Sequence, residues 1–87
     1  MTHRSTNLIV VPAYNEAATI DAVLEDVAAH AVGWDVVVVD DGSTDDTAAR
    51  AERRGAAVLR MPFNLGIGGA VQSGFTYALE RGYARMV

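Results

Sequence analysis

The sequence predicts an α/β fold in which a parallel sheet is built in the order βαβαβαβ. Short apolar runs alternate with longer segments in which apolar residues recur every three or four positions. Glycine follows most of the longer segments, as it often does at helix ends. This alternation is typical of parallel strands joined by helical crossovers. The 87 residues form one small domain or part of a larger one, and a hydrophobic content of 51% excludes a disordered tail.

The first strand is expected over residues 8–11, where four apolar residues are closed by Pro12. Apolar side chains then recur at helical spacing: Ala17, Ile20, Val23, Leu24, Val27, Ala28 and Ala31. We expect them to form the buried face of a helix that stops at Gly33.

The second strand is expected over residues 36–39, where four consecutive valines predict burial on both faces of the sheet. Hydroxyl and carboxylate side chains at residues 44–47 suit the start of a helix, which runs to about Arg54 and ends at Gly55. A short third strand is expected over residues 56–59.

The last predicted unit begins with a glycine-rich turn over residues 64–69. After it, a helix is expected to bury one apolar stripe, made of Ala70, Val71, Gly74, Phe75, Ala78 and Leu79. Gly82 ends this helix, Gly74 is expected to allow close packing, and residues 83–87 begin a fourth strand.

Two polar clusters follow the first two strands, at the sheet edge where open parallel sheets bind ligands. Pro12, Tyr14 and Glu16 belong to the first cluster, and Asp40 and Asp41 to the second. Neighbouring strand ends lie about 5 Å apart, so both clusters can line one pocket. Tyr14 can cover a flat base, while carboxylates accept hydrogen bonds from base N–H groups or ribose hydroxyls. Taken singly, these residues also fit strand ends, helix starts and turns.

The glycine-rich turn has two interpretations, phosphate contact or a purely structural role for Asn64, Gly66, Gly68 and Gly69. The amides before a helix can bind a phosphate. The segment lacks the G-x-G-x-x-G spacing and follows the third strand rather than the first, so we favour a tight turn with close packing.

Composition excludes several classes of function. The net charge is -4 and no basic stripe is present, which argues against nucleic acid as a partner. The absence of cysteine excludes disulfides, zinc–thiolate sites and thiol catalysis. His3 and His30 have no partner at metal-ligand spacing and are expected to face solvent. The apolar run at residues 8–11 is too short for a signal peptide or membrane span, so a cytoplasmic location is expected.

Three motifs together resemble the successive signatures of family 2 glycosyltransferases. They are VPAYNE at residues 11–16, VVDDGSTD at residues 38–45 and NLGIGGA at residues 64–70. The chain is most similar to the polyprenol-phosphate sugar transferases of that family, the dolichyl-phosphate mannosyltransferase-like enzymes. The resemblance covers nearly all of the chain and implies the Rossmann-like, three-layer GT-A fold.

The resemblance also implies roles for individual residues. Pro12, Tyr14 and Glu16 match positions that hold the base and ribose of a nucleotide, and Asp40 and Asp41 match the acidic pair that binds the nucleoside. The implied reaction is inverting transfer of a sugar from a GDP- or UDP-sugar to a polyprenyl (dolichyl or undecaprenyl) phosphate, a lipid phosphate acceptor at the cytoplasmic face of a membrane.

In this family the fourth strand runs into an Asp-x-Asp motif that binds Mg²⁺ or Mn²⁺, and the ion bridges the diphosphate of the donor. Residues 82–87 match the segment that leads into that motif. We therefore expect residues 1–87 to be the nucleotide-binding N-terminal part of a single GT-A catalytic domain. No catalytic residue and no metal ligand is expected within it, and it is expected to be inactive alone.

Other functions remain as alternatives. A receiver domain needs its acidic pair after the first strand and a later lysine, and the chain has no lysine. A Rossmann oxidoreductase needs its glycine fingerprint directly after the first strand, where Pro12 to Asn15 stand instead. A non-catalytic nucleotide-binding or interaction module fits the absence of a chemical site. Strands at the margins of the sheet leave open edges, which makes self-association a further expectation.

Overall fold

The computed structural model describes residues 6–87, and a four-stranded parallel sheet with strand order β3-β2-β1-β4 runs through it. The strands are β1 (Asn7–Ala13), β2 (Asp35–Asp40), β3 (Ala57–Arg60) and β4 (Arg85–Met86). The helices are α1 (Ile20–His30), α2 (Thr47–Arg53) and α3 (Gly66–Glu80). The predicted order βαβαβαβ is confirmed.

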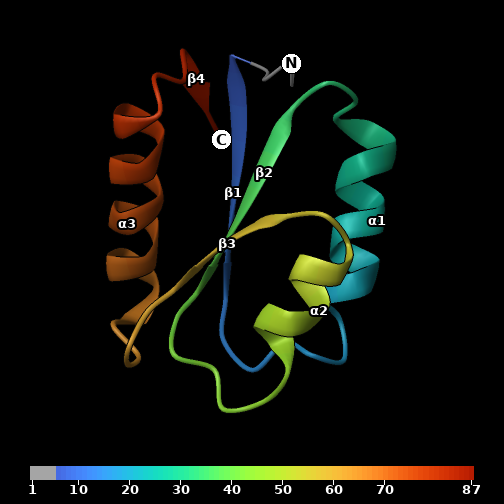
Figure 1. Ribbon diagram of the computed structural model, residues 1–87, viewed down its shortest axis with the longest axis vertical. Coiled ribbons are helices and arrows are strands. Elements are labelled where there is room, and N and C mark those ends of the chain that lie inside the picture. Colours follow the sequence, from blue (N-terminus) through green and yellow to red (C-terminus); the bar gives the residue numbers. More distant parts are fainter. Residues whose placement is uncertain (1–5) are drawn as a thin grey trace.

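Helices cover both faces of the sheet, which gives three layers (Figure 1). Helix α3 lies on one face, and α1 and α2 lie on the other. Each interface has its own apolar cluster. Ala13, Ile20, Leu24, Val38 and Ala51 form the cluster below α1 and α2. Leu8, Val37 and Ala78 form the cluster below α3.

Strand β2 lies between two neighbouring strands and is buried on both faces. Val37, Val38 and Val39 are each 0% exposed. Successive side chains of a strand point to opposite faces, so one run of valines supplies both apolar clusters. The predicted burial of this strand on both sides is confirmed.

Strand β1 passes through Pro12 and ends at Ala13, so the prediction that proline closes the strand is wrong. Proline lacks an N–H group, but at residue 12 this group would not point toward β2. The N–H of Val10 donates to Val87 on the β4 side at 2.8 Å. Residue 12 has the same orientation in the pleat and lies beyond the residues that β4 pairs. The ladder between β1 and β2 therefore loses no hydrogen bond at Pro12.

Helix α1 begins at Ile20 and buries less than its pattern predicts. Ile20 and Leu24 are buried, whereas Val23 is 40% exposed and Ala28 is also exposed. The helix ends at His30, three residues before Gly33, which adopts a positive φ in the following turn. His30 is exposed as predicted and pairs with Asp26, while His3 lies outside the described residues.

Helix α3 begins at Gly66, four residues earlier than predicted, so Gly68 and Gly69 belong to its first turn rather than to a loop. Its buried face is narrower than the predicted stripe. Ala70, Gly74 and Ala78 are buried. Val71, Phe75 and Leu79, one position further along, are 44–64% exposed. A stripe of three small residues lets the helix approach the sheet closely and leaves the larger side chains on its flank.

The closest approach lies at Gly74. A Cβ atom at this position would stand 2.4 Å from Cγ1 of Val10 on β1. The predicted role of Gly74 in close packing is confirmed. Its partner is a half-buried side chain that packs against the apolar cluster below α3, rather than backbone.

The remaining boundaries differ by a few residues from the prediction. Helix α2 begins at Thr47 after a turn, β3 begins at Ala57, and β4 contains only Arg85 and Met86. Gly55 and Gly82 follow their helices with positive φ, as expected. Among residues 6–87, no helix combines the length and the apolar character needed to cross a bilayer.

Gly74→Ala is expected to destabilise the fold by about 1–3 kcal/mol, because its methyl group overlaps Val10. Gly68→Ala is the matched control, since the same helix offers open space there. Alanine also favours a helix over glycine by about 1 kcal/mol, so this variant is expected to be neutral or stabilising. Urea unfolding followed by circular dichroism measures both. Equal stability of the two variants would contradict the packing at Gly74.

Candidate functional site

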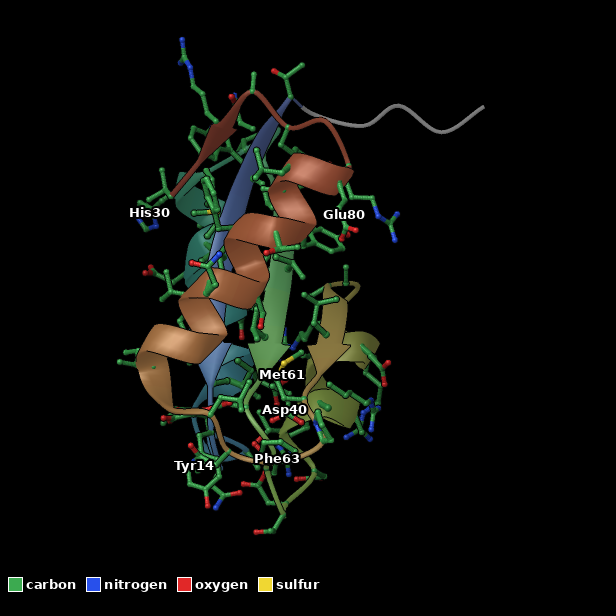
Figure 2. All side chains as sticks on the ribbon, turned by 90° about the vertical axis from the view of Figure 1, so that its left-hand side faces the viewer. Tyr14, His30, Asp40, Met61, Phe63 and Glu80 are labelled. Carbon is green, nitrogen blue, oxygen red and sulfur yellow. The ribbon has the colours of Figure 1, made fainter. Side chains whose placement is uncertain are left out.

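The carboxyl ends of β1 and β2 bring the two predicted polar clusters together. Ala13, the last residue of β1, pairs with Asp40, the last residue of β2. One step further, the N–H of Asp41 donates to the carbonyl of Ala13 at 2.8 Å. Both clusters therefore begin from a fixed point at one end of the molecule, where Figure 2 shows Tyr14, Asp40 and Phe63.

The loop after β1 (residues 14–19) is tied to the segment after β2 (residues 41–47) by three consecutive backbone amides. The N–H of Asn15 donates to the hydroxyl of Ser43 at 2.8 Å. The N–H of Glu16 donates to the hydroxyl of Thr47 at 2.9 Å. The N–H of Ala17 donates to a carboxylate oxygen of Asp45 at 3.2 Å. Three amides that begin a helical turn thus find their acceptors on side chains from another loop.

The side chain of Asn15 also accepts a hydrogen bond in the opposite direction, from the segment after β2 to the loop after β1. Its side-chain oxygen accepts the N–H of Thr44 at 2.8 Å. Its φ of 52° places it in the left-handed region, which asparagine tolerates better than most residues. The two loops therefore hold each other through both backbone and side chain.

Asp45 has the largest share of these contacts. Besides Ala17, it receives the hydroxyl and the backbone N–H of Thr47. The Thr47 hydroxyl, assisted by the N–H groups of Thr47 and Ala17, holds the pKa of Asp45 below its ordinary value of 3.8. Thr47 itself is fully buried and bridges Asp45 to Glu16.

Asp40 and Asp41 are adjacent and both buried, at 6% and 4% exposure, but they make different contacts. Asp40 accepts the N–H of Ser43 at 3.2 Å, which closes the turn after β2. Asp41 reaches the start of α3 instead. Its two oxygens accept the N–H groups of Leu65 and Gly66, each at 2.8 Å.

A pocket of about 290 Å³ opens between these segments. It is lined by Pro12, Ala13, Tyr14, Glu16, Asp41, Asn64, Gly66, Ile67 and Ala70. The lining combines apolar surface with a few convergent polar groups, as in small-molecule sites. Six of the nine predicted site residues are therefore in one place: Pro12, Tyr14, Glu16, Asp41, Asn64 and Gly66.

Three predicted residues do not line this pocket. Asp40 is occupied with its own turn. Gly68 and Gly69 lie in the first turn of α3, where a Cβ at Gly69 would meet the side chain of Leu65. Asn15, Asp45 and Thr47 were missed by the site prediction. Small polar residues cluster after both strands in the sequence, and this cluster could have drawn attention to them. The sequence alone does not say which of these residues hydrogen-bond to one another.

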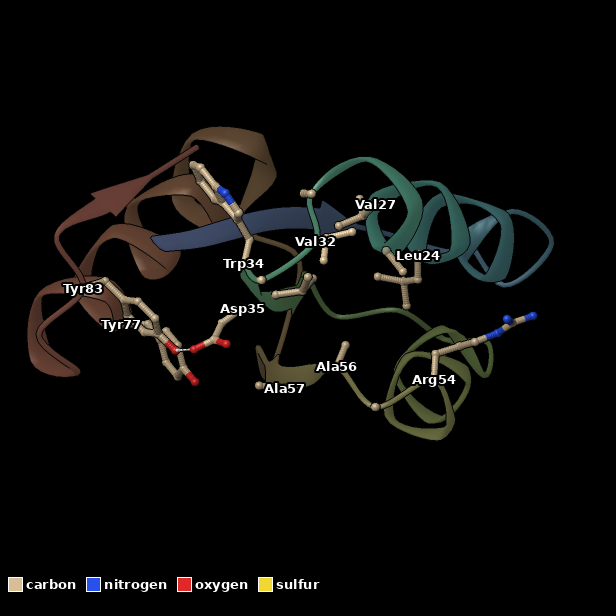
Figure 3. A pocket seen from close by; sticks show the side chains of 15 residues that line it. Leu24, Val27, Val32, Trp34, Asp35, Arg54, Ala56, Ala57, Tyr77 and Tyr83 are labelled. Atoms are coloured by element: carbon tan, nitrogen blue, oxygen red, sulfur yellow. Dashed lines mark hydrogen bonds between the residues drawn. The ribbon is translucent and has the colours of Figure 1, made fainter. Parts of the chain in front are cut away.

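A larger hollow of about 500 Å³ lies at the opposite, amino end of β2 and β3 (Figure 3). Trp34, Asp35, Tyr77 and Tyr83 contribute to its lining. The hydroxyl of Tyr83 donates to Asp35 at 2.6 Å, so this carboxylate already has a partner within the fold. Parallel sheets of this type bind ligands at the carboxyl ends of their strands. We therefore place the candidate site in the smaller pocket.

The acidic residues of the candidate site do not form a metal centre. Within residues 6–87, no group of three or more His, Cys, Asp or Glu side chains is arranged to hold an ion. Asp41 binds backbone amides through both of its oxygens, and Asp40 and Asp45 also accept backbone N–H groups. The described residues therefore do not fit a metal site by themselves.

Comparison with known proteins identifies the family of this fold and site. The family described as glycosyl transferase family 2 matches residues 8–84. An undecaprenyl-phosphate mannosyltransferase from Micrococcus luteus is 38% identical over 85 residues, which cover 92% of this chain and 35% of that enzyme. The chain thus spans about a third of the length of this relative.

Solved GT-A glycosyltransferases share the fold, and two of them illustrate the similarity. A mannosyltransferase from Pyrobaculum calidifontis in complex with GDP-Man and Mn²⁺ superposes with a TM-score of 0.76 and 26% identity, over 87% of this chain and 25% of that one. A glucosyl-3-phosphoglycerate synthase from Mycobacterium tuberculosis with Mn²⁺, UDP and glucosyl-3-phosphoglycerate gives a TM-score of 0.71 and 34% identity, over 85% and 29%.

Asp45→Asn is expected to lower stability at neutral pH and to lose its effect in acid. Because the folded pKa of Asp45 is below 3.8, its carboxylate stabilises the fold above that pH. This stabilisation disappears as the pH falls through 3.8 and then through the folded pKa. Urea unfolding of both proteins across this range measures the difference. Exposed Glu80→Gln is the control, and a difference for Asp45→Asn that stays constant with pH would contradict the assignment.

Proposed function

Because the chain belongs to glycosyl transferase family 2, we propose that its pocket at the ends of β1 and β2 is the nucleoside site of a sugar transferase. The observation that carries this proposal is the convergence of Pro12, Tyr14, Glu16 and Asp41 on one pocket. The donor would be a nucleotide-diphosphate sugar, with GDP and UDP as the two candidate carriers.

The polar and aromatic groups of the pocket suit the parts of a nucleoside. Tyr14 is 45% exposed and offers a ring face to the base. Asp41 keeps free lone pairs on both oxygens after accepting two amides, and these can accept base N–H groups. Glu16, exposed at the rim, can accept ribose hydroxyls. Asp40 accepts a hydrogen bond within the turn beside them and does not contact the nucleoside in this proposal.

The start of α3 is proposed to have a structural role rather than to bind phosphate. The N–H groups of Leu65 and Gly66 already donate to Asp41. An incoming phosphate would meet that carboxylate at the same helix end, and two negative charges repel each other there. These contacts support the structural interpretation of Asn64, Gly66, Gly68 and Gly69.

The acceptor is proposed to be a polyprenyl phosphate, as for the relative from Micrococcus luteus. A phosphate nucleophile is already anionic and needs no strong general base, which suits direct, inverting displacement. A lipid acceptor would place this work at a membrane, and we propose its cytoplasmic face. A divalent ion such as Mg²⁺ or Mn²⁺ would stabilise the charge of the diphosphate leaving group. Residues 6–87 hold no set of ligands for it, so residues 1–87 alone are proposed to be inactive.

A non-catalytic nucleotide-binding module is the second candidate, favoured by the absence of a metal-ligand set among the described residues. The two candidates share the nucleoside pocket and differ in chemistry. Sugar transfer by the 87-residue chain would refute its proposed inactivity.

Tyr14→Ala is expected to weaken binding of GDP or UDP by about tenfold or more, because stacking on an aromatic ring contributes about 1–3 kcal/mol per base. Phe75→Ala is the matched control, since both rings are 45% exposed and Phe75 lies outside the pocket. Isothermal titration calorimetry measures both affinities with and without Mn²⁺. Binding is expected to be independent of Mn²⁺. Equal affinity of the two variants would contradict the assigned site.

Self-association through the sheet is a further part of the proposal. Strands β3 and β4 are the outer strands, and each has one edge without a strand partner within residues 6–87. Such edges can pair with a second copy. Sedimentation velocity is expected to show an average mass that rises with concentration, and a monomer at every concentration would contradict this expectation.

A further inference from the structure

Asp41 joins two segments that lie far apart in the sequence. Its side chain is 4% exposed, and its oxygens accept the amides of Leu65 and Gly66, which are 24 and 25 residues away. One oxygen serves each amide at 2.8 Å. This is the arrangement by which a helix start binds an anion, and here the anion belongs to the chain itself.

The backbone at residues 65–66 is shaped for this carboxylate. Leu65 has right-handed helical angles, and Gly66 has a φ of 82°. Two successive residues of opposite hand turn their N–H groups toward one point and form a concave anion site, called a nest. A positive φ is unfavourable for most residues other than glycine, so Gly66 makes the nest possible.

Gly42 brings the two segments into direct contact beside Asp41. A Cβ atom on Gly42 would stand 2.7 Å from the backbone nitrogen of Asn64 and from the carbonyl carbon of Phe63. The turn after β2 and the segment before α3 therefore touch through their backbones. The carboxylate of Asp41 then fixes their relative position.

Few other groups hold the segment before α3. Phe63, Leu65 and Ile67 are 46–76% exposed, so their side chains contribute little burial. Segments with few buried contacts open with low free energy. Asn64, Gly66 and Ile67 nevertheless form one wall of the pocket. The position of that wall therefore depends on a small number of hydrogen bonds, two of them to Asp41. The N–H of Leu65 donates to Asp41, whereas the N–H of Gly66 is shared between Asp41 and the side-chain oxygen of Asn64, at 2.8 Å from each.

We propose that Asp41 is a positioning residue that holds the start of α3 against the pocket and so keeps one wall of the nucleoside site in place. The part of this statement that concerns the nucleoside rests on the proposed function. Two lone pairs of the carboxylate serve the nest, and two remain for a ligand. Ligand binding and closure of this wall are thereby coupled through one side chain.

Amide hydrogen exchange of the ligand-free protein tests the anchor directly. Asp41→Asn replaces one acceptor oxygen by a donor, and Gly66→Ala strains the nest at its positive φ. Each is expected to speed exchange at residue 65 by about tenfold or more, because hydrogen bonds to charged groups are the strong ones. A smaller increase is expected at residue 66, since its N–H also donates to Asn64. The amides of Val37 and Val38 report whether the fold is intact. Gly66→Asn, which tolerates a left-handed backbone, is expected to retain most of the protection.

Gly33→Ala is the matched control for Gly66→Ala. Gly33 has a φ of 87° and open space around it, as Gly66 does, but it lies at the other end of the sheet. It is expected to leave exchange at residues 65 and 66 unchanged. Wild-type exchange at these residues in Asp41→Asn, with protected strand amides, would overturn the anchor. If Asp41→Asn does not fold, the comparison of Gly66→Ala with Gly33→Ala decides in its place.

Affinity for GDP and UDP tests the link to the site. Gly66→Ala is expected to weaken binding several-fold although no side chain is removed, whereas Gly33→Ala leaves it unchanged. Faster exchange in Gly66→Ala with wild-type affinity would refute the positioning role. If the wild-type chain binds neither nucleotide, the proposed function fails, and the exchange rates alone decide whether Asp41 anchors the segment.

Discussion

The candidate site depends on one interaction, the hydrogen bonding of three backbone amides after β1 to side chains of the segment after β2. Ser43, Thr47 and Asp45 supply the acceptors. The bond from Glu16 is partly buried, where an N–H group must find a partner, whereas the bonds from Asn15 and Ala17 are exposed. The adjacency of the two strands makes this exchange possible, and the exchange in turn fixes where Tyr14 and Glu16 stand. Sheet, loops and pocket are therefore parts of one hydrogen-bonded arrangement rather than independent features.

The order of elements and the meeting of the two polar clusters were predictable, because both follow from local patterns. A run of four valines predicts a doubly buried strand in any parallel sheet, and polar residues after strands predict the ligand edge. The width of a buried helix face is not local. Val71, Phe75 and Leu79 share the spacing of buried residues, yet they are exposed because Gly74 brings α3 so close to β1 that three small residues fill the contact. The spacing of apolar residues identifies the face of a helix that packs on the sheet. The distance between helix and sheet decides how much of that face is buried.

Asp40 and Asp41 show a second limit of sequence reasoning. Two adjacent carboxylates with the same chemistry were predicted to share one role, and the strand geometry points them at different partners. The glycine-rich segment shows the same limit, since its sequence does not identify the group that its amides bind. Its composition is compatible with an anion from outside or from within, and the sequence does not say which. The partner of Gly66 is an aspartate 25 residues earlier, and only the folded chain brings the two together.

Pro12 has a consequence for the edge of β1 that faces β4. Its missing N–H lies on that side, so a strand that pairs with β1 at residue 12 there lacks the hydrogen bond that another residue would donate. The carbonyl of Pro12 can still accept a hydrogen bond. Pairing along this edge is therefore weaker by one hydrogen bond beside the candidate pocket, which Pro12 lines, than near Asn7 and Leu8, where β4 pairs.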